Sequence, residues 1–242
     1  MIINIVALIP ARSGSKGLVN KNIKLLGGKS LLNWSISACK RSKLINRIIV
    51  STDSKEYANL SVQYGAEAPF LRPPSISADN STDYEFVIHA LDWLKQNGDE
   101  PEYIAHIRPT TPFRSPEIID KAILTFAQSP LSTSLRSVHE MSESAYKTFE
   151  ISKEGNLMQI FSGNSNLDES NNARQKFPKT YSANGYVDIL STKFIRKKKL
   201  LHGDRVISFV TENTTEVDNQ DDFDFLEYKL VKSPHFFENI FI

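Results

Sequence analysis

The sequence predicts an α/β protein built on an open, mostly parallel β-sheet flanked by helices. A continuous apolar and β-branched run spans Ile2 to Ile9, which is typical of a parallel strand buried on both faces. Apolar residues then recur at helical spacing over 30–41, and a second short apolar strand follows at 47–51. This alternation of strand and helix is repeated twice more, and three such units predict an open parallel sheet.

The next helices carry recognisable start signals. Asp53 precedes Glu56 by three residues, which predicts a capped second helix that Gly65 ends. The elements that follow are a helix capped by Thr82 with Glu85, a strand over 103–107, and a helix begun by Ser115 and Pro116.

The regular alternation breaks after about Val138. Two short strands are predicted at 146–151 and 157–161, separated by Gly155 and Asn156, which is a hairpin signal. The stretch 162–175 is almost wholly polar. We therefore expect an inserted arm at this point.

Sheet-like sequence resumes after the expected arm. Strands are predicted at 186–190 and 206–210, and an amphipathic helix over about 220–231 ends the pattern. The sequence contains no internal repeat. One domain spanning 1–242, with the arm inserted in it, accounts for this organisation.

Composition limits the classes of function. The 242 residues include 29 Lys and Arg against 28 Asp and Glu, a formal net charge of +1, which gives no general reason to bind nucleic acid or an anionic membrane. The first apolar run is far shorter than the roughly 20 residues of a membrane helix and has no basic segment before it. The lone Cys39 is expected to be a buried core thiol. These features predict a cytoplasmic protein without a nucleic-acid or membrane partner.

The loop between the first strand and the first helix, PARSGSKGLVNKN at 10–22, is the richest in polar chemistry. Ligands of open parallel sheets bind where such loops follow the strands. Two glycines allow close backbone approach and three cations lie within ten residues: Gly14, Gly17, Arg12, Lys16 and Lys21. A polyphosphate suits this loop, although it matches neither the Walker A pattern nor the G-x-G-x-x-G pattern. The alternative is a solvated turn.

The string ARSGSKGLVNKN resembles the nucleotide-binding signature of the CMP-sialic acid synthetase (acylneuraminate cytidylyltransferase) family. Further matches follow in family order across nearly the whole chain: STD at 51–53, LRP at 71–73, RPTTPFR at 108–114, ARQ at 173–175 and NG at 184–185. The related Kdo cytidylyltransferases have a first loop that reads differently.

The resemblance implies transfer of CMP from CTP to a nine-carbon 2-keto sugar acid with release of pyrophosphate. It also implies a Rossmann-like domain of the nucleotide-diphospho-sugar transferase type, a Mg²⁺ requirement, and a homodimer built through the arm, placed at roughly 139–182. Such a transfer needs charge neutralisation and positioning more than a protein nucleophile. The five histidines are scattered, and no Ser-His-Asp or Cys-His arrangement is convincing.

By the same resemblance, the 10–22 loop binds the nucleotide. Arg12, Ser15 and Lys16 would hold the CTP phosphates with Lys21 alongside, and Asn22 would contact the nucleotide. Arg12, Lys16 and Lys21, together with Asp218, are therefore the expected catalytic residues.

The acidic stretch EVDNQDD at 216–222 lies where the family places an aspartate pair. Glu216 and Asp218 are two apart on an extended segment and would face the same side. Asp218 matches the family, whereas Glu216 replaces an aspartate. Both are candidate Mg²⁺ ligands, since Mg²⁺ prefers hard oxygens. The alternative is that these carboxylates, with Asp221 and Asp222, only cap the following helix.

The acceptor subsite is expected to contain cations and amides. By the resemblance, Lys147 and Arg174 match positions that face the sugar or the reacting phosphate. Asn184 with Gly185 falls in the strand-entry turn that closes the pocket, and all four are expected to belong to the sugar subsite. Arg108 departs from the family, which commonly has Gln there, and a guanidinium offers a charged fork. Ser182 and Ala183 stand where sialic-acid enzymes often carry Arg-Pro. Both departures point to a legionaminic- or pseudaminic-type acid.

The sequence leaves the roles of two residues open: Asp79 and Thr82 either reach the nucleotide or acceptor, or cap the start of a helix. It also leaves two alternatives to a nonulosonate synthetase, namely a CMP-Kdo-type synthetase and a nucleotide-binding module without turnover. A dehydrogenase lacks its glycine fingerprint here.

Overall fold

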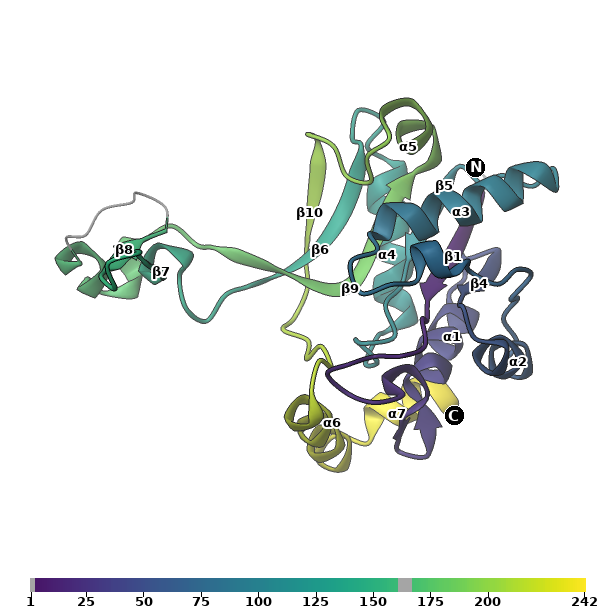
Figure 1. Cartoon of the computed structure of the whole chain (residues 1–242), viewed down its shortest axis with the longest axis horizontal. Coiled ribbons are helices and arrows are strands. Elements are labelled where there is room, and N and C mark those ends of the chain that lie inside the picture. The colour runs from purple at the N-terminus through teal and green to yellow at the C-terminus, as the bar shows by residue number, and fades with distance from the viewer. Residues whose placement is uncertain (1–2, 161–166) are drawn as a thin grey trace.

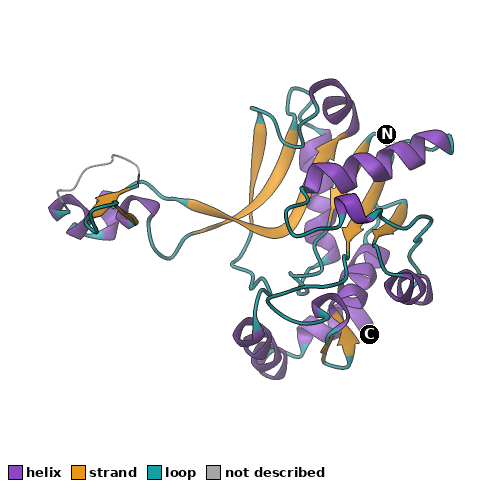
Figure 2. Cartoon of the chain, in the orientation of Figure 1, coloured by secondary structure: helices purple, strands orange, loops and turns teal. Residues whose placement is uncertain are grey.

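A six-stranded β-sheet runs through the body of the molecule, with helices on both faces (Figure 2). The computed structural model describes residues 3–160 and 167–242. The strand order is β10-β6-β9-β5-β1-β4. The strands are β1 (Ile5–Pro10), β4 (Arg47–Ser51), β5 (Tyr103–His106), β6 (Ser134–Glu140), β9 (Tyr181–Ser191) and β10 (Val206–Val210).

The sheet is mostly parallel, as predicted. β1 pairs in parallel with β4 and with β5, and β10 pairs in parallel with β6. β9 is antiparallel to both of its neighbours, β5 and β6. The carboxyl ends of β1, β4 and β5 therefore meet at one edge of the sheet, where loops rich in polar residues follow them.

Each face of the sheet has its own hydrophobic core. Ile5, Ala7 and Ile9 of β1 belong to one core, while Val6 and Leu8 belong to the other, so β1 is buried on both faces as expected. Helices α1 (Leu31–Arg41) and α4 (Pro116–Ala127) cover the first face, and α3 (Asp83–Gln96) and α5 (Thr192–Lys198) cover the second. The remaining α-helices of the described residues are α2 (Lys55–Gln63), α6 (Gln220–Lys232) and α7 (His235–Phe241).

The predicted helix starts are confirmed except for one. Thr82 with Glu85 forms a capping box on α3, and the Ser115 hydroxyl caps α4. The prediction that Asp53 caps α2 is wrong, because the Ser54 side chain accepts the capping hydrogen bond. Two helices were not anticipated: α5, which the Ser191 side chain caps, and α7.

β6 and β9 extend beyond the sheet and carry a segment that projects from the body (Figure 1). Its described residues, 141–160 and 167–180, are called the arm below. The predicted hairpin is confirmed but shorter, with β7 (Phe149–Ile151) paired to β8 (Leu157–Gln159). A 3-10 helix, Ala145–Lys147, stands where the first of these strands was expected to begin. Residues 161–166 of the predicted hairpin and polar stretch lie outside the described residues, as does Ile2 of the first predicted strand.

No helix in the described ranges combines the length and the apolar character needed to cross a bilayer.

Trp34 on α1 joins three parts of the larger core. Its indole is fully buried, and Nε1 donates a hydrogen bond to the Leu26 carbonyl oxygen at 3.0 Å. Its ring packs edge-on against Phe113, Phe237 and Phe241. Trp34 therefore ties α1 to the loop after β5 and to the C-terminal helix α7.

We expect Trp34→Ala to lower the free energy of unfolding by about 3–5 kcal/mol, because it opens a cavity and removes the ring contacts of α7. Trp34→Phe keeps an aromatic ring and should cost less. Urea denaturation followed by circular dichroism measures both changes. An unchanged denaturation midpoint for Trp34→Ala would show that α7 does not depend on this indole.

Candidate active site

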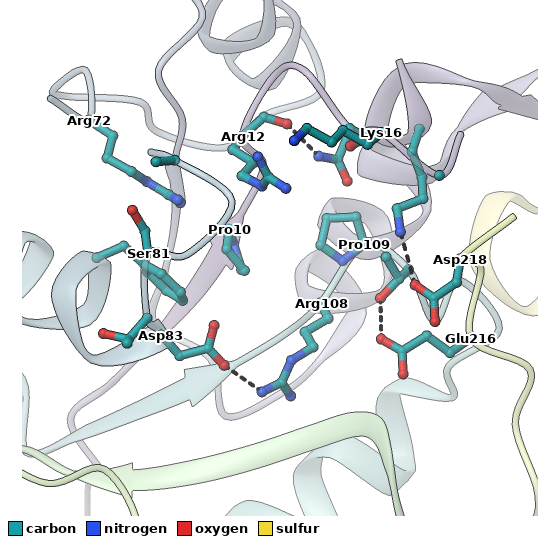
Figure 3. Close-up of a pocket in the computed structure, with 18 residues that line it drawn as sticks. Pro10, Arg12, Lys16, Arg72, Ser81, Asp83, Arg108, Pro109, Glu216 and Asp218 are labelled. Carbon is teal, nitrogen blue, oxygen red and sulfur yellow. Dashed lines mark hydrogen bonds and ion pairs between the residues drawn. The ribbon is translucent and has the colours of Figure 1, made fainter. Parts of the chain in front are cut away.

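A cleft of about 480 Å³ opens at the carboxyl ends of β1 and β5. Four chain segments form its walls: the 10–22 loop, the segment from Arg72 into α3, residues 108–110 after β5, and residues 216–218 ahead of α6. Figure 3 shows basic and acidic side chains from all four segments facing one another across this cleft. The cleft thus occupies the position at which open α/β sheets bind ligands.

The 10–22 loop is held from two directions. The Asp53 carboxylate, at the end of β4, accepts a hydrogen bond from the Ser13 backbone N–H at 2.7 Å and another from the Ser13 hydroxyl at 2.9 Å. The Asn22 side chain donates to the Arg12 carbonyl oxygen at 2.9 Å. Asn22 is buried and lines the cleft. These bonds explain why Asp53 does not cap α2, since its carboxylate fixes the loop instead.

Gly17 allows the loop to pack against the other wall of the cleft. A Cβ added at Gly17 would lie only 2.4 Å from the Asp218 carbonyl oxygen, so no larger residue fits without a shift. At the same junction the Lys21 ammonium donates to the Val217 carbonyl oxygen at 2.8 Å and lies 3.2 Å from an Asp218 carboxylate oxygen. The two walls therefore meet around a glycine and a lysine of the loop.

The cations of the loop face the cleft and are paired. Arg12 Nη2 lies 2.8 Å from one carboxylate oxygen of Asp79, and the Lys16 ammonium pairs with the other. Hydrogen bonds from Lys16 and Arg12 hold the pKa of Asp79 below its ordinary value. Ser15 also lines the cleft. The loop residues expected to bind a nucleotide are thus brought together.

Glu216 and Asp218 both face the cleft, as their spacing predicts (Figure 3). Val217 between them is fully buried, and its N–H donates to the Thr110 carbonyl oxygen at 2.8 Å. The Thr110 hydroxyl donates to Glu216 Oε1 at 2.8 Å. The backbone of this segment is therefore fixed, and both carboxylates are presented to the cleft.

The capping alternative does not apply to Glu216 and Asp218. Asn219 and Asp222 form the capping box of α6, and Asp222 also accepts a hydrogen bond from the Asp218 N–H at 2.9 Å. Among the described residues, no three His, Cys, Asp or Glu side chains gather closely enough to hold a metal by themselves. Two carboxylates are nevertheless a suitable donor set for Mg²⁺, which is commonly held by one or two carboxylates plus substrate phosphates.

Arg108 lies between two carboxylates that the sequence analysis missed. Its Nη1 donates to Asp188 Oδ2 at 3.0 Å, and its Nη2 donates to Asp83 Oδ2 at 2.8 Å (Figure 3 shows the second). The Asp188 side chain is 1% exposed, whereas that of Asp83 is 46% exposed. Asp188 is an acidic residue within an apolar strand, and such a residue predicts a buried partner.

Two further arginines near the cleft were also missed. Arg72, in the LRP motif, lines the cleft and donates to the Ser51 carbonyl oxygen at 2.8 Å. Arg114 donates from Nη2 to the Gly185 carbonyl oxygen at 2.9 Å. Burial lowers the pKa of each guanidinium to about 10, so both carry their charge at neutral pH. Arg72 lies in the LRP motif and Arg114 in the RPTTPFR motif, so the motif matches could have identified both arginines as candidate site residues.

Asn184 and Gly185 support the wall of the cleft instead of lining it. The buried Asn184 donates from Nδ2 to the Thr211 hydroxyl at 2.6 Å, and its carbonyl oxygen accepts from the Thr111 hydroxyl at 3.3 Å. Gly185 has φ +64°, and an added Cβ would lie 3.0 Å from Thr111 Oγ1. Glycine is therefore needed where this strand passes behind Arg108.

Thr82, Lys147 and Arg174 have local roles in the described structure. Thr82 lines the cleft and also forms the capping box of α3. Lys147 and Arg174 lie on the arm, where Lys147 donates to the Asn172 carbonyl oxygen at 3.2 Å and Arg174 pairs with Glu140 at 3.1 Å. Neither arm residue lines the cleft of its own chain.

Known proteins similar to this chain were found by sequence. The CMP-N,N'-diacetyllegionaminic acid synthase of Legionella pneumophila is 43% identical over 119 residues, which are 49% of this chain and 51% of that protein. The N-acylneuraminate cytidylyltransferase of Escherichia coli is 41% identical over 119 residues, 49% of this chain and 27% of that protein. Post-translational flagellin modification protein B of Campylobacter coli is 29% identical over 230 residues, 93% of this chain and 94% of that protein. The chain thus spans about half the length of the first relative and about a quarter of the second.

Solved structures share the fold at low sequence identity. The structure of a CMP:2-keto-3-deoxy-manno-octonic acid synthetase complexed with CTP superposes with a TM-score of 0.70 at 12% identity, covering 95% of this chain and 99% of that one. A family model described as cytidylyltransferase matches residues 6–216, which include the 10–22 loop and extend to Glu216. This chain belongs to the cytidylyltransferase family.

Proposed function

We propose that this chain transfers CMP from CTP to a nine-carbon 2-keto sugar acid of the sialic, legionaminic or pseudaminic type and releases pyrophosphate. The observation that carries the proposal is the cleft itself, in which the cations Arg12, Lys16 and Lys21 face the carboxylates Glu216 and Asp218. Relatives named for CMP-diacetyllegionaminate, acylneuraminate and pseudaminic acid chemistry support this acceptor class.

In this proposal Arg12, Ser15 and Lys16 bind the CTP phosphates, and Asn22 contacts the nucleotide. A hydroxyl oxygen of the acceptor forms a bond to the α-phosphorus and gives up its proton to solvent, the bond from that phosphorus to the bridging oxygen of the β-phosphate breaks, and pyrophosphate leaves. Arg12 and Lys16 offset the charge that develops on the leaving group. The positioning supplied by the cleft replaces a protein nucleophile.

Glu216 and Asp218 would hold a Mg²⁺ ion, which when bound neutralises charge on the pyrophosphate leaving group. Lys21 keeps Asp218 oriented toward the cleft through their 3.2 Å ion pair. Glu216 Oε1 is engaged by Thr110.

The arm provides the basis for proposing a homodimer. Lys147 and Arg174 match family positions near the sugar, yet both lie on the projecting arm and outside the cleft of their own chain. They can meet an acceptor only if the arm of one copy approaches the cleft of another. We further propose a cytoplasmic enzyme without nucleic-acid or membrane partners, which its net charge of +1 supports.

The second candidate is a CMP-Kdo-type synthetase, favoured by the likeness to the 2-keto-3-deoxy-manno-octonic acid synthetase. That likeness concerns the fold alone, and the SKGLVNKN sequence of the 10–22 loop fits the nonulosonate enzymes better. A module that binds CTP without turnover is the third possibility. Pyrophosphate release separates the three, because it depends on both turnover and the acceptor.

We expect pyrophosphate release from CTP and Mg²⁺ with one acid of a panel of neuraminic, legionaminic, pseudaminic and Kdo-type acids. Lys16→Ala should lower kcat/KM about 100-fold without altering the circular dichroism spectrum, because it removes a cation from the phosphates. Lys95→Ala, an exposed lysine near the end of α3, is the control. Near-normal turnover of Lys16→Ala would exclude a role for Lys16 in neutralising the phosphates. If CTP binds but no acid of the panel gives pyrophosphate release, the non-catalytic module is favoured.

Asp218→Asn should raise the Mg²⁺ concentration needed for half-maximal activity by about tenfold or more, because even partners that only orient metal ligands contribute that much. Asp221→Asn, in the first turn of α6, removes the same charge outside the cleft and should leave the titration unchanged. If Asp218→Asn alters the KM for CTP but not the Mg²⁺ titration, Asp218 acts only by positioning Lys21.

Arg108→Gln should change the ratio of kcat/KM between two acceptors by about tenfold while the KM for CTP changes less than about twofold. Because this substitution removes a cation from the buried Asp188, the double variant Arg108→Gln/Asp188→Asn is the matched control for stability. Equal losses with every acceptor in both variants would count against a selective role for Arg108.

A further inference from the structure

Asp79 forms ion pairs with Arg12 and Lys16, the two cations that the proposed function assigns to the CTP phosphates. Its two carboxylate oxygens pair with different cations, one with Arg12 at 2.8 Å and the other with Lys16. A phosphate group that bound both cations would need the same position. Asp79 and a polyphosphate therefore cannot pair fully with Arg12 and Lys16 at the same time.

The environment of Asp79 allows it to leave this position. Its side chain is 42% exposed, and that of Lys16 is 82% exposed. Asp79 lies in the turn before the N-cap Thr82, where the Ser81 N–H bonds to the Ala78 carbonyl oxygen. Exposed ion pairs contribute little to stability, because solvent screens them. Asp79 can thus move away without unwinding α3 or uncovering a core residue.

We propose that Asp79 is an internal competitor for the polyphosphate subsite, displaced when CTP binds and returning as pyrophosphate leaves. The inference rests on the proposed function and assigns Asp79 a specificity role at that site. When a phosphate replaces the Asp79 carboxylate, Arg12 and Lys16 only exchange one anionic partner for another. An anion that contacts only these two cations therefore gains little binding free energy over Asp79. A polyphosphate that also reaches Lys21 or a bound metal gains contacts that Asp79 does not offer.

Removing Asp79 should change ligand affinity in opposite directions for a competitor and for a substrate contact. If Asp79 bound the nucleotide directly, its removal would weaken binding. If Asp79 competes with the phosphates, its removal strengthens the binding of any ligand that carries them and leaves cytidine, which carries none, unaffected. Hydrogen bonds from Lys16 and Arg12 lower the pKa of Asp79, so the paired carboxylate is ionised at neutral pH.

The test is isothermal titration calorimetry of the full chain with inorganic pyrophosphate, CTP and cytidine in magnesium-free buffer. Asp79→Asn should bind pyrophosphate and CTP about three- to tenfold more tightly than the unchanged chain, in line with the strength of exposed ion pairs. Asp79→Glu keeps the charge and should behave like the unchanged chain. Asp204→Asn, an exposed carboxylate in the turn before β10, controls for the change in net charge.

Equal or weaker pyrophosphate binding by Asp79→Asn would overturn the inference. If CTP then still binds to both chains, the proposed function stands and Asp79 is a substrate contact or a bystander. If neither chain binds CTP, the proposed function fails together with the inference. An equal gain in affinity by Asp204→Asn would also overturn it, because net charge alone would then explain the effect.

Discussion

The cleft depends on one close approach between chain segments two hundred residues apart. Gly17 packs against the backbone at Asp218, and Lys21 bridges from the loop to the Val217 carbonyl oxygen. The buried Val217 then fixes Thr110 through a backbone hydrogen bond, which brings the loop after β5 to the same place. A side chain at position 17 would collide with the Asp218 backbone, so the two walls of the cleft could not approach one another this closely.

A second constraint is the balance of charge across the cleft. Each inward-facing cation of the 10–22 loop has a carboxylate partner, with Arg12 and Lys16 sharing Asp79 and Lys21 paired with Asp218. Arg108 on the opposite wall has Asp83. Because these pairs are at least partly exposed, solvent screens them and their exchange for other anions costs little. The cations of the site are therefore paired with carboxylates that are themselves 42–73% exposed to solvent.

The sequence predicted the parallel sheet and the basic loop because both depend on local patterns, whereas the roles of the cleft residues came from the family resemblance. The buried run of β1 and the basic loop after it are adjacent in the chain, and Glu216 and Asp218 alternate around an apolar residue. Asp53 was misassigned because its partner, Ser13, is 40 residues away, and a local capping pattern competes with such a contact only in the folded chain. The sequence also could not predict that Lys147 and Arg174 lie away from the cleft, since their distance from it depends on the course of the arm.

Arg108 and Asp188 illustrate why a single departure from a family pattern is hard to interpret in isolation. Asp188 is buried, and its other charged neighbour, Arg136, has Nε 3.8 Å away, outside hydrogen-bond range. Burial and the charge of Arg108 hold the pKa of His106 far below its ordinary value, so this nearby imidazole stays neutral. Asp188 thus relies mainly on the guanidinium of Arg108, which is the closer of its two cationic partners and donates a hydrogen bond to it. A glutamine at 108 would supply no charge, so Arg108 and Asp188 form one unit, in which the buried carboxylate orients a guanidinium that lines the cleft.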